Sequence, residues 1–117
     1  MTIKTKRVYD PPEPEDGYRL LVTRSWPRGL SKAKVGGWER GLSPSQLILE
    51  AWRGGLITWE TFEQMYRDQV TGKPLFLKAA RYKEQQYGTL TLLCFEDLDQ
   101  PGTRCHRTIL KDILDQL

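Results

Sequence analysis

The chain has few of the residues that mark common catalytic and structural classes. Its 117 residues include two cysteines and one histidine. Two cysteines in a chain of this length do not make a disulfide framework, and no CxxC pair is present. Walker A, GxGxxG, HExxH and GxSxG motifs are also missing, which argues against the enzyme classes that these motifs define.

Long hydrophobic runs are absent as well. No apolar stretch approaches the roughly 20 residues that a transmembrane helix needs. The N-terminus, Met1 to Arg7, is basic but lacks the apolar segment of a secretory signal. We therefore expect a cytoplasmic protein with no membrane partner.

What the chain does contain is enough for one folded domain over residues 1–117. Hydrophobic residues make up 38%, including four Trp, five Tyr and three Phe, and these can fill a modest core. The net charge of +3 is uneven, because residues 1–40 hold nine Lys and Arg against five Asp and Glu. That N-terminal third is the better place for an acidic partner, although a surplus of this size is also common on a solvated surface.

Hydrophobic spacing and turn residues predict an α/β fold. A continuous apolar run at Leu20-Leu21-Val22 indicates a strand buried on both faces. Ser43 and Pro44 resemble a helix cap and a first helical residue. The expected elements are strands over 3–8 and 18–22, helices over 44–53, 59–71 and 74–86, a strand over 89–95, and a helix from about 104 to the end.

The order β-β-α-α-α-β-α favours a small two-layer or three-layer α/β domain. Its sheet is expected to be mainly parallel, with about three or four strands. Strands 18–22 and 89–95 are separated by enough helix for a right-handed crossover, so we expect them to pair in parallel. The direction of the strand over 3–8 is left open, because the loop after it is short.

Parallel pairing would bring two loops to one edge of the sheet. The loop after Val22 holds Arg24, Ser25, Trp26 and Arg28, and the segment after strand 89–95 leads to Cys105-His106-Arg107. Arginines suit phosphate or carboxylate, Trp26 offers a flat surface to a ring, and a helix start adds positive partial charge. This pattern predicts a pocket for a small anionic, phosphorylated or nucleotide-like ligand.

The same residues could serve binding alone or a reaction. For a reaction, we assign Cys105 or Glu96 as nucleophile or base and His106 to proton transfer, because a thiol in the first turn of a helix favours the thiolate. For binding, the candidates are Arg24, Ser25, Trp26, Arg28, Arg107, Tyr9 and Asp10.

Structural interpretations stand beside these roles. Arg24 and Arg28 could pair with Asp10, Glu13 or Glu96 on the surface, Trp26 could belong to the core, and Cys94 could be a buried structural thiol. Cys105 could equally be inert, His106 could be a surface or packing residue at the helix start, and Glu96 could accept backbone hydrogen bonds in its own loop.

No cofactor is implied, and no metal site is expected. Cys94, Cys105 and His106 are three soft ligands, but neighbouring residues on a helix point in different directions, and structural zinc takes four ligands. A disulfide between Cys94 and Cys105 is within reach of the short loop but is not expected in a reducing cytosol.

Two other function classes remain open. A nucleic-acid binding module would use the basic N-terminal third together with Tyr9, Tyr18 and Trp26. A redox-responsive or interaction domain would use Cys105 as a reactive thiol. The sequence indicates no oligomeric state.

Several segments together resemble the short form of the DUF488 family. They are Lys6 to Pro12, Asp16 to Arg19, Val22 to Leu30, Trp38, Leu42 to Ser45, Leu92 to Glu96 and Cys105 to Arg107. The resemblance implies one compact α/β domain with a shared site. Relatives commonly read Val-Asp-Arg before Trp-Pro-Arg-Gly, whereas this chain has Thr23 in the Asp place. If that Asp is a catalytic carboxylate, this chain lacks it, and Asp10 and Glu96 remain as candidate acids.

Overall fold

The centre of the molecule is a four-stranded parallel sheet. In the computed structural model, which describes residues 2–95 and 104–117, the strands lie in the order β1 (Thr2–Arg7), β4 (Thr89–Cys94), β2 (Tyr18–Leu21) and β3 (Gly37–Trp38). Every neighbouring pair is parallel. The predicted α/β class and the predicted parallel pairing of the second and last long strands are confirmed.

The first strand, whose direction the sequence left open, runs parallel to β4. Thr2 pairs with Thr89 and Arg7 with Cys94, so the carboxyl ends of the two strands coincide. The strand β3 was not predicted, because two residues carry no periodic pattern. Gly37 permits it, since a Cβ there would lie 2.3 Å from the Tyr18 hydroxyl oxygen.

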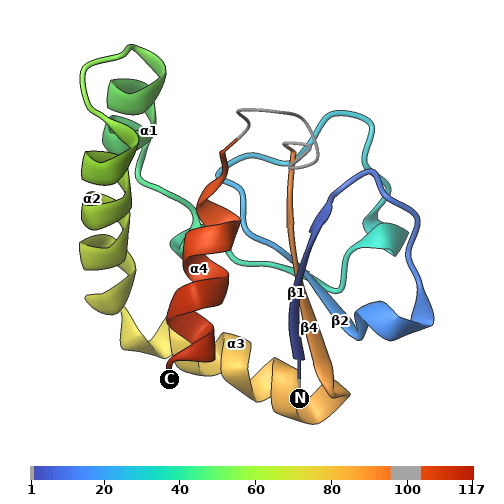
Figure 1. Cartoon of the computed structure of the whole chain (residues 1–117). Helices are drawn as coiled ribbons and strands as arrows, with labels where there is room; N and C mark the ends of the chain where they lie inside the picture. Colours follow the sequence, from blue (N-terminus) through green and yellow to red (C-terminus); the bar gives the residue numbers. More distant parts are fainter. Residues whose placement is uncertain (1, 96–103) are drawn as a thin grey trace.

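The four α-helices of the described residues lie on one side of the sheet, and irregular chain covers the other side (Figure 1). The helices are α1 (Gln46–Arg53), α2 (Trp59–Thr71), α3 (Pro74–Tyr87) and α4 (His106–Asp115). Short 3₁₀ turns at Pro14–Asp16 and Lys32–Lys34 lie within the irregular cover. Among the described residues, no helix combines the length and apolarity needed to cross a membrane.

Two apolar clusters sandwich the sheet because successive strand residues point to opposite faces. Leu20 and Leu92 pack in the larger cluster with the helices, whereas Leu21 and Leu93 pack in the smaller one with Val8. The continuous apolar run in β2 therefore has the meaning that the sequence suggested: both faces of the strand are buried.

The ends of two helices differ from the expected positions. The N-cap of α1 is Ser45, not Ser43, and its hydroxyl accepts a hydrogen bond from the Ile48 amide at 3.3 Å. Ser43 is buried, and its hydroxyl donates to the Arg40 carbonyl at 2.7 Å instead. The last helix begins at His106, so Cys105 is its N-cap and has extended backbone angles.

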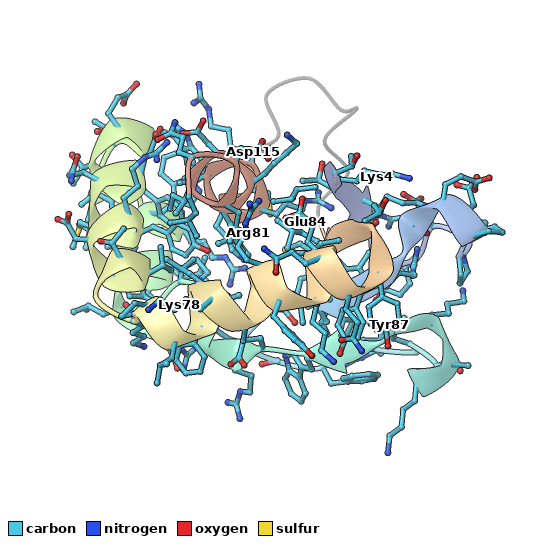
Figure 2. The ribbon with its side chains drawn as sticks, turned by 90° about the horizontal axis from the view of Figure 1, so that it is seen from below. Lys4, Lys78, Arg81, Glu84, Tyr87 and Asp115 are labelled. Carbon is cyan, nitrogen blue, oxygen red and sulfur yellow. The ribbon has the colours of Figure 1, made fainter. Side chains whose placement is uncertain are left out.

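The helix α3 runs along the end of the molecule opposite to the start of α4 (Figure 1). Figure 2 views this end and shows Arg81 and Glu84 on the side of α3 that faces α4. The Arg81 guanidinium donates to the buried Glu84 carboxylate at 2.7 Å. This pair gives the buried carboxylate a partner and anchors α3, so we assign it a structural role.

Candidate functional site

A small cavity opens at the carboxyl edge of the sheet, close to the start of α4. Its volume is about 40 Å³. Parallel strands direct their carboxyl ends to one edge, so residues that follow β2 meet residues that follow β4 there. The lining residues are Thr23, Arg24, Ser43, Pro44, Leu49, Arg53, Cys94, Phe95 and His106.

Both cysteines and the histidine lie together beside this cavity. The Cys94 and Cys105 sulfurs and a His106 ring nitrogen are all within 4.8 Å of one another, and all three residues are buried. The Cys105 Sγ is 3.6 Å from His106 Nδ1. The expectation that side chains 105 and 106 point apart is therefore wrong. Cys105 precedes the first helical residue, and its extended backbone turns its thiol toward the imidazole.

The imidazole is held by contacts on two sides. His106 Nε2 lies 2.7 Å from the Val22 carbonyl oxygen. A carbonyl only accepts hydrogen bonds, so Nε2 carries a proton, and Nδ1 is the atom that faces Cys105. The Tyr66 ring meets the imidazole edge-on, with centroids 5.4 Å apart. These contacts fix the orientation of the ring.

Electrostatics at this cluster favour a thiolate. The pKa of the Cys105 thiol is lowered by a hydrogen bond from Cys94, against the opposing effect of burial, and His106 and Arg107 lower it further. The thiol is nevertheless only 3% exposed. Of the two cysteines, it is Cys94 that lines the cavity.

Two arginines at the cavity come from different parts of the chain. Arg24 follows β2 and is half-buried, and Arg53 ends α1 and is exposed. Within the described residues neither forms a salt bridge. The alternative in which Arg24 pairs with Asp10 or Glu13 is therefore not seen. The cavity has two positive side chains without a described counter-charge.

The rest of the loop after β2 is arranged around its own backbone. The Thr23 hydroxyl donates to the carbonyl of exposed Ser25 at 2.7 Å. Trp26 donates from Nε1 to the Leu30 carbonyl at 3.0 Å and packs on the side of the sheet that lacks helices. Its ring meets Trp38 edge-on at 5.5 Å between centroids. Neither Ser25 nor Trp26 lines the cavity.

Residues near the end of β1 also lie outside the cavity. Arg28 is exposed, and its carbonyl accepts a hydrogen bond from the Tyr9 hydroxyl at 2.9 Å. The Asp10 carboxylate accepts from the Arg7 amide at 3.0 Å, which closes the turn after the strand. Among described residues, Asp10 forms no ion pair with Arg28.

Arg107 is buried and donates from Nη1 to the Lys6 carbonyl. This bond ties the first turn of α4 to β1, and Arg107 does not line the cavity. Glu96, the candidate base, lies outside the described residues.

Sequence reasoning missed Arg53 and Ser43 as cavity residues. A basic residue in the last turn of a helix is normally explained by the negative end of the helix dipole, so Arg53 gave no distinct signal. Ser43 was interpreted as a cap. Only the path of the chain from β3 into α1 brings these residues next to Thr23 and His106.

Comparisons with known proteins agree with the resemblance drawn from the motifs. The uncharacterized protein YeaO of Escherichia coli K12 is 43% identical over 68 residues, which cover 56% of this chain and 59% of YeaO. The uncharacterized proteins Rv3073c of Mycobacterium tuberculosis H37Rv and Mb3100c of Mycobacterium bovis are each 31% identical over 70 residues, which cover 58% of this chain and 59% of each relative. The match thus spans under two thirds of each relative's length.

No solved structure matches the chain significantly. The family match covers more of the chain than the relatives do. Residues 2–117 match the family described as DUF488-N3i, the inactive DUF488-N3 subclade. This chain therefore belongs to the DUF488-N3i family.

Proposed function

We propose that the chain binds a small oxyanion, such as a phosphate or the terminal phosphate or carboxylate of a larger ligand, in the cavity beside α4. The observation that carries the proposal is that Arg24 and Arg53 line one cavity with no described salt bridge to either. Guanidinium groups match the planar oxygen pairs of phosphates and carboxylates. The nearby start of α4 adds favourable partial charge.

The size of the cavity limits the ligand. Water-sized groups can occupy about 40 Å³ of it, and one water molecule needs about 10–15 Å³ on this measure. A small charged group therefore fits this space, whereas a nucleobase is too large for it. Any ring of a nucleotide-like ligand would lie outside the cavity. Trp26 is a poor stacking surface for it, since its ring packs against Trp38.

Binding rather than catalysis is the favoured role. The family that this chain matches is described as inactive. Thr23 lines the cavity at the position where the resemblance places an aspartate. Without that carboxylate, the cavity keeps the charge of its arginines, which favours an anion. The Cys105 thiol is buried and does not line the cavity, which also fits a binding site better than a nucleophile that must meet a substrate.

Calorimetry with inorganic phosphate tests the proposal. Charged hydrogen bonds contribute about 1.5–3 kcal/mol each, so Arg24→Gln and Arg53→Gln should each weaken phosphate binding by about tenfold to a hundredfold. Arg28→Gln removes the same charge from the same loop outside the cavity and should leave affinity nearly unchanged. Equal losses in all three variants would mean that general surface charge, not the cavity, attracts phosphate.

A substitution at Thr23 tests the charge argument separately. Thr23→Asp places a carboxylate at the cavity and should abolish phosphate binding, while the neutral Thr23→Asn of similar size should retain most of it. If both variants bind phosphate as the unaltered chain does, the oxyanion does not occupy this cavity.

A further inference from the structure

The buried cluster of Cys94, Cys105 and His106 has the composition and the spacing of a metal site. These are the donor types that zinc and other soft cations take from proteins. They come from the end of β4 and the start of α4, which meet at the carboxyl edge of the sheet. From this geometry we infer that the chain binds one zinc ion, or a similar soft divalent cation, through the two sulfurs and His106 Nδ1.

The distances support tetrahedral zinc. With Zn–S of about 2.3 Å and Zn–N of about 2.0–2.1 Å, a tetrahedral ion holds its sulfur and nitrogen ligands about 3.6 Å apart. The Cys105 Sγ and His106 Nδ1 are 3.6 Å apart, and all three donor atoms fall within 4.8 Å. An ion therefore needs only small side-chain adjustments to reach all three atoms.

The contacts of the imidazole fit a metal ligand. His106 donates from Nε2 to the Val22 carbonyl at 2.7 Å, which leaves Nδ1 as the nitrogen available to the ion. A backbone carbonyl is one of the common outer partners of a zinc-bound histidine, because it fixes the tautomer and aims the ring. The edge-on Tyr66 ring limits rotation further.

The cavity supplies the access and the fourth position. Three protein ligands leave one corner of a tetrahedron open, as in zinc sites that exchange a ligand. Cys94 and His106 both line the cavity, so an ion could enter there and take water as its fourth ligand. The inference goes beyond the proposed function, because it rests on three donor atoms and not on Arg24 or Arg53.

Cobalt(II) is a suitable probe for the reduced, full-length chain in a phosphate-free buffer. Tetrahedral Co²⁺ with thiolate ligands absorbs visible light and shows thiolate-to-metal bands in the near ultraviolet. We expect both features, saturation at one ion per chain, and their loss on adding Zn²⁺. The chain has two cysteines and one histidine, so thiolate bands report on this cluster alone.

Two variants test the ligands, and a third serves as the control. Cys105→Ser should lose the thiolate bands or weaken cobalt binding by at least about tenfold, the effect expected from loss of a zinc-site ligand or outer contact. His106→Asn should weaken it similarly. Thr108→Ala is the matched control, because the Thr108 hydroxyl bonds the Cys105 carbonyl in the same turn but offers no metal donor there. Circular dichroism identifies any variant that fails to fold.

A second measurement uses only the unaltered chain. Zn²⁺ should raise the Tm reversibly, with the rise removed by a chelator, because a ligand that binds the native state stabilises it. Zn²⁺ should also slow alkylation of both cysteines. No cobalt bands, or bands of unchanged intensity and cobalt affinity in Cys105→Ser, would overturn the inference. The inference would also be wrong if Zn²⁺ changed neither the Tm nor the alkylation rate of the reduced chain. Phosphate binding that persists without metal would leave the proposed function intact in that case.

Discussion

Asp16 is the buried charge whose removal should affect stability most. Its carboxylate is fully buried and accepts hydrogen bonds from Lys4 at 3.2 Å, Lys6 at 3.0 Å and Arg19 at 2.5 Å. The Glu13 amide donates to the same carboxylate at 3.1 Å. Asp16→Asn would keep the shape and remove the negative charge that three cations share.

The loss of stability in Asp16→Asn depends on the hydrogen bonds that Arg19 and Lys6 retain. Removing one partner of a buried ion pair typically costs about 3–5 kcal/mol, because the other charge stays buried. Arg19 would still donate to the Lys34 and Asp10 carbonyls, and Lys6 would still reach Glu13. These remaining bonds place the expected loss near the lower bound, at about 3 kcal/mol of the free energy of unfolding.

Urea denaturation followed by tryptophan fluorescence measures this loss. Lys4→Met provides the comparison, because Lys4 is about a third exposed and makes a single bond to Asp16. Because water also solvates the Lys4 ammonium, its pairing should contribute only about 0–1 kcal/mol. If Asp16→Asn costs no more than Lys4→Met, the buried network does not support the fold and the reasoning is wrong.

Acid should act on the same carboxylate. Burial raises the pKa of Asp16, but hydrogen bonds from Lys6, Arg19 and the Glu13 amide outweigh it and hold the pKa well below the usual range. The group therefore adds stability above its unfolded pKa, about 3.9, and that stability is lost as the pH falls toward the folded pKa. The urea midpoint of Asp16→Asn should fall less steeply in acid than that of the unaltered chain. If the urea midpoints of the two proteins fall equally steeply as the pH is lowered, this assignment is wrong.

Three further substitutions test local contacts, each by urea denaturation. Tyr66→Phe removes the buried hydroxyl that donates to the Leu42 carbonyl at 2.6 Å, and the orphaned acceptor should cost about 1–3 kcal/mol; a neutral result would show that water replaces the bond. Gly17→Ala should prevent stable folding or cost several kcal/mol, since its φ is +61° and a Cβ would lie 2.2 Å from the Thr89 carbonyl oxygen; a folded variant of near-normal stability would refute that clash. Ser45→Ala should cost about 1 kcal/mol through loss of the α1 cap, and an unchanged midpoint would mean that α1 needs no cap.

The fold was accessible from the sequence because local signals agreed with one another. Thr58 is the N-cap and Gly72 the C-cap of α2, as their residue types suggest. The apolar run around Leu21 and the later apolar run around Leu92 gave two buried strands, and the helices between them required a parallel crossover. The strand β3 has only two residues, too few for a periodic pattern. One of them is a glycine because the Tyr18 side chain leaves no room for a Cβ there, and glycine is not a residue typical of strands.

Charge was harder to interpret from the sequence. Three of the basic residues in the N-terminal third, Lys4, Lys6 and Arg19, gather on one buried carboxylate. Asp16 therefore holds these three cations at one place instead of leaving them spread along an exposed surface. This reduces the support for a nucleic-acid module, which needs positive charge spread along an exposed surface.

The cluster of Cys94, Cys105 and His106 could not be predicted from the sequence, because α4 begins two residues later than expected, at His106. In a helix that began near residue 104, the side chains of Cys105 and His106 would point in different directions from the helix axis, and their donor atoms could not meet with the Cys94 sulfur. With the first helical residue at His106, Cys105 becomes an extended cap, and its sulfur turns toward the imidazole at 3.6 Å. Helix ends are where local sequence signals are weakest, since capping, fraying and tertiary contacts compete there. The bond from His106 to the Val22 carbonyl, 84 residues away, is one such contact. A long-range hydrogen bond thus helps decide where α4 starts, and with it whether the three donors converge.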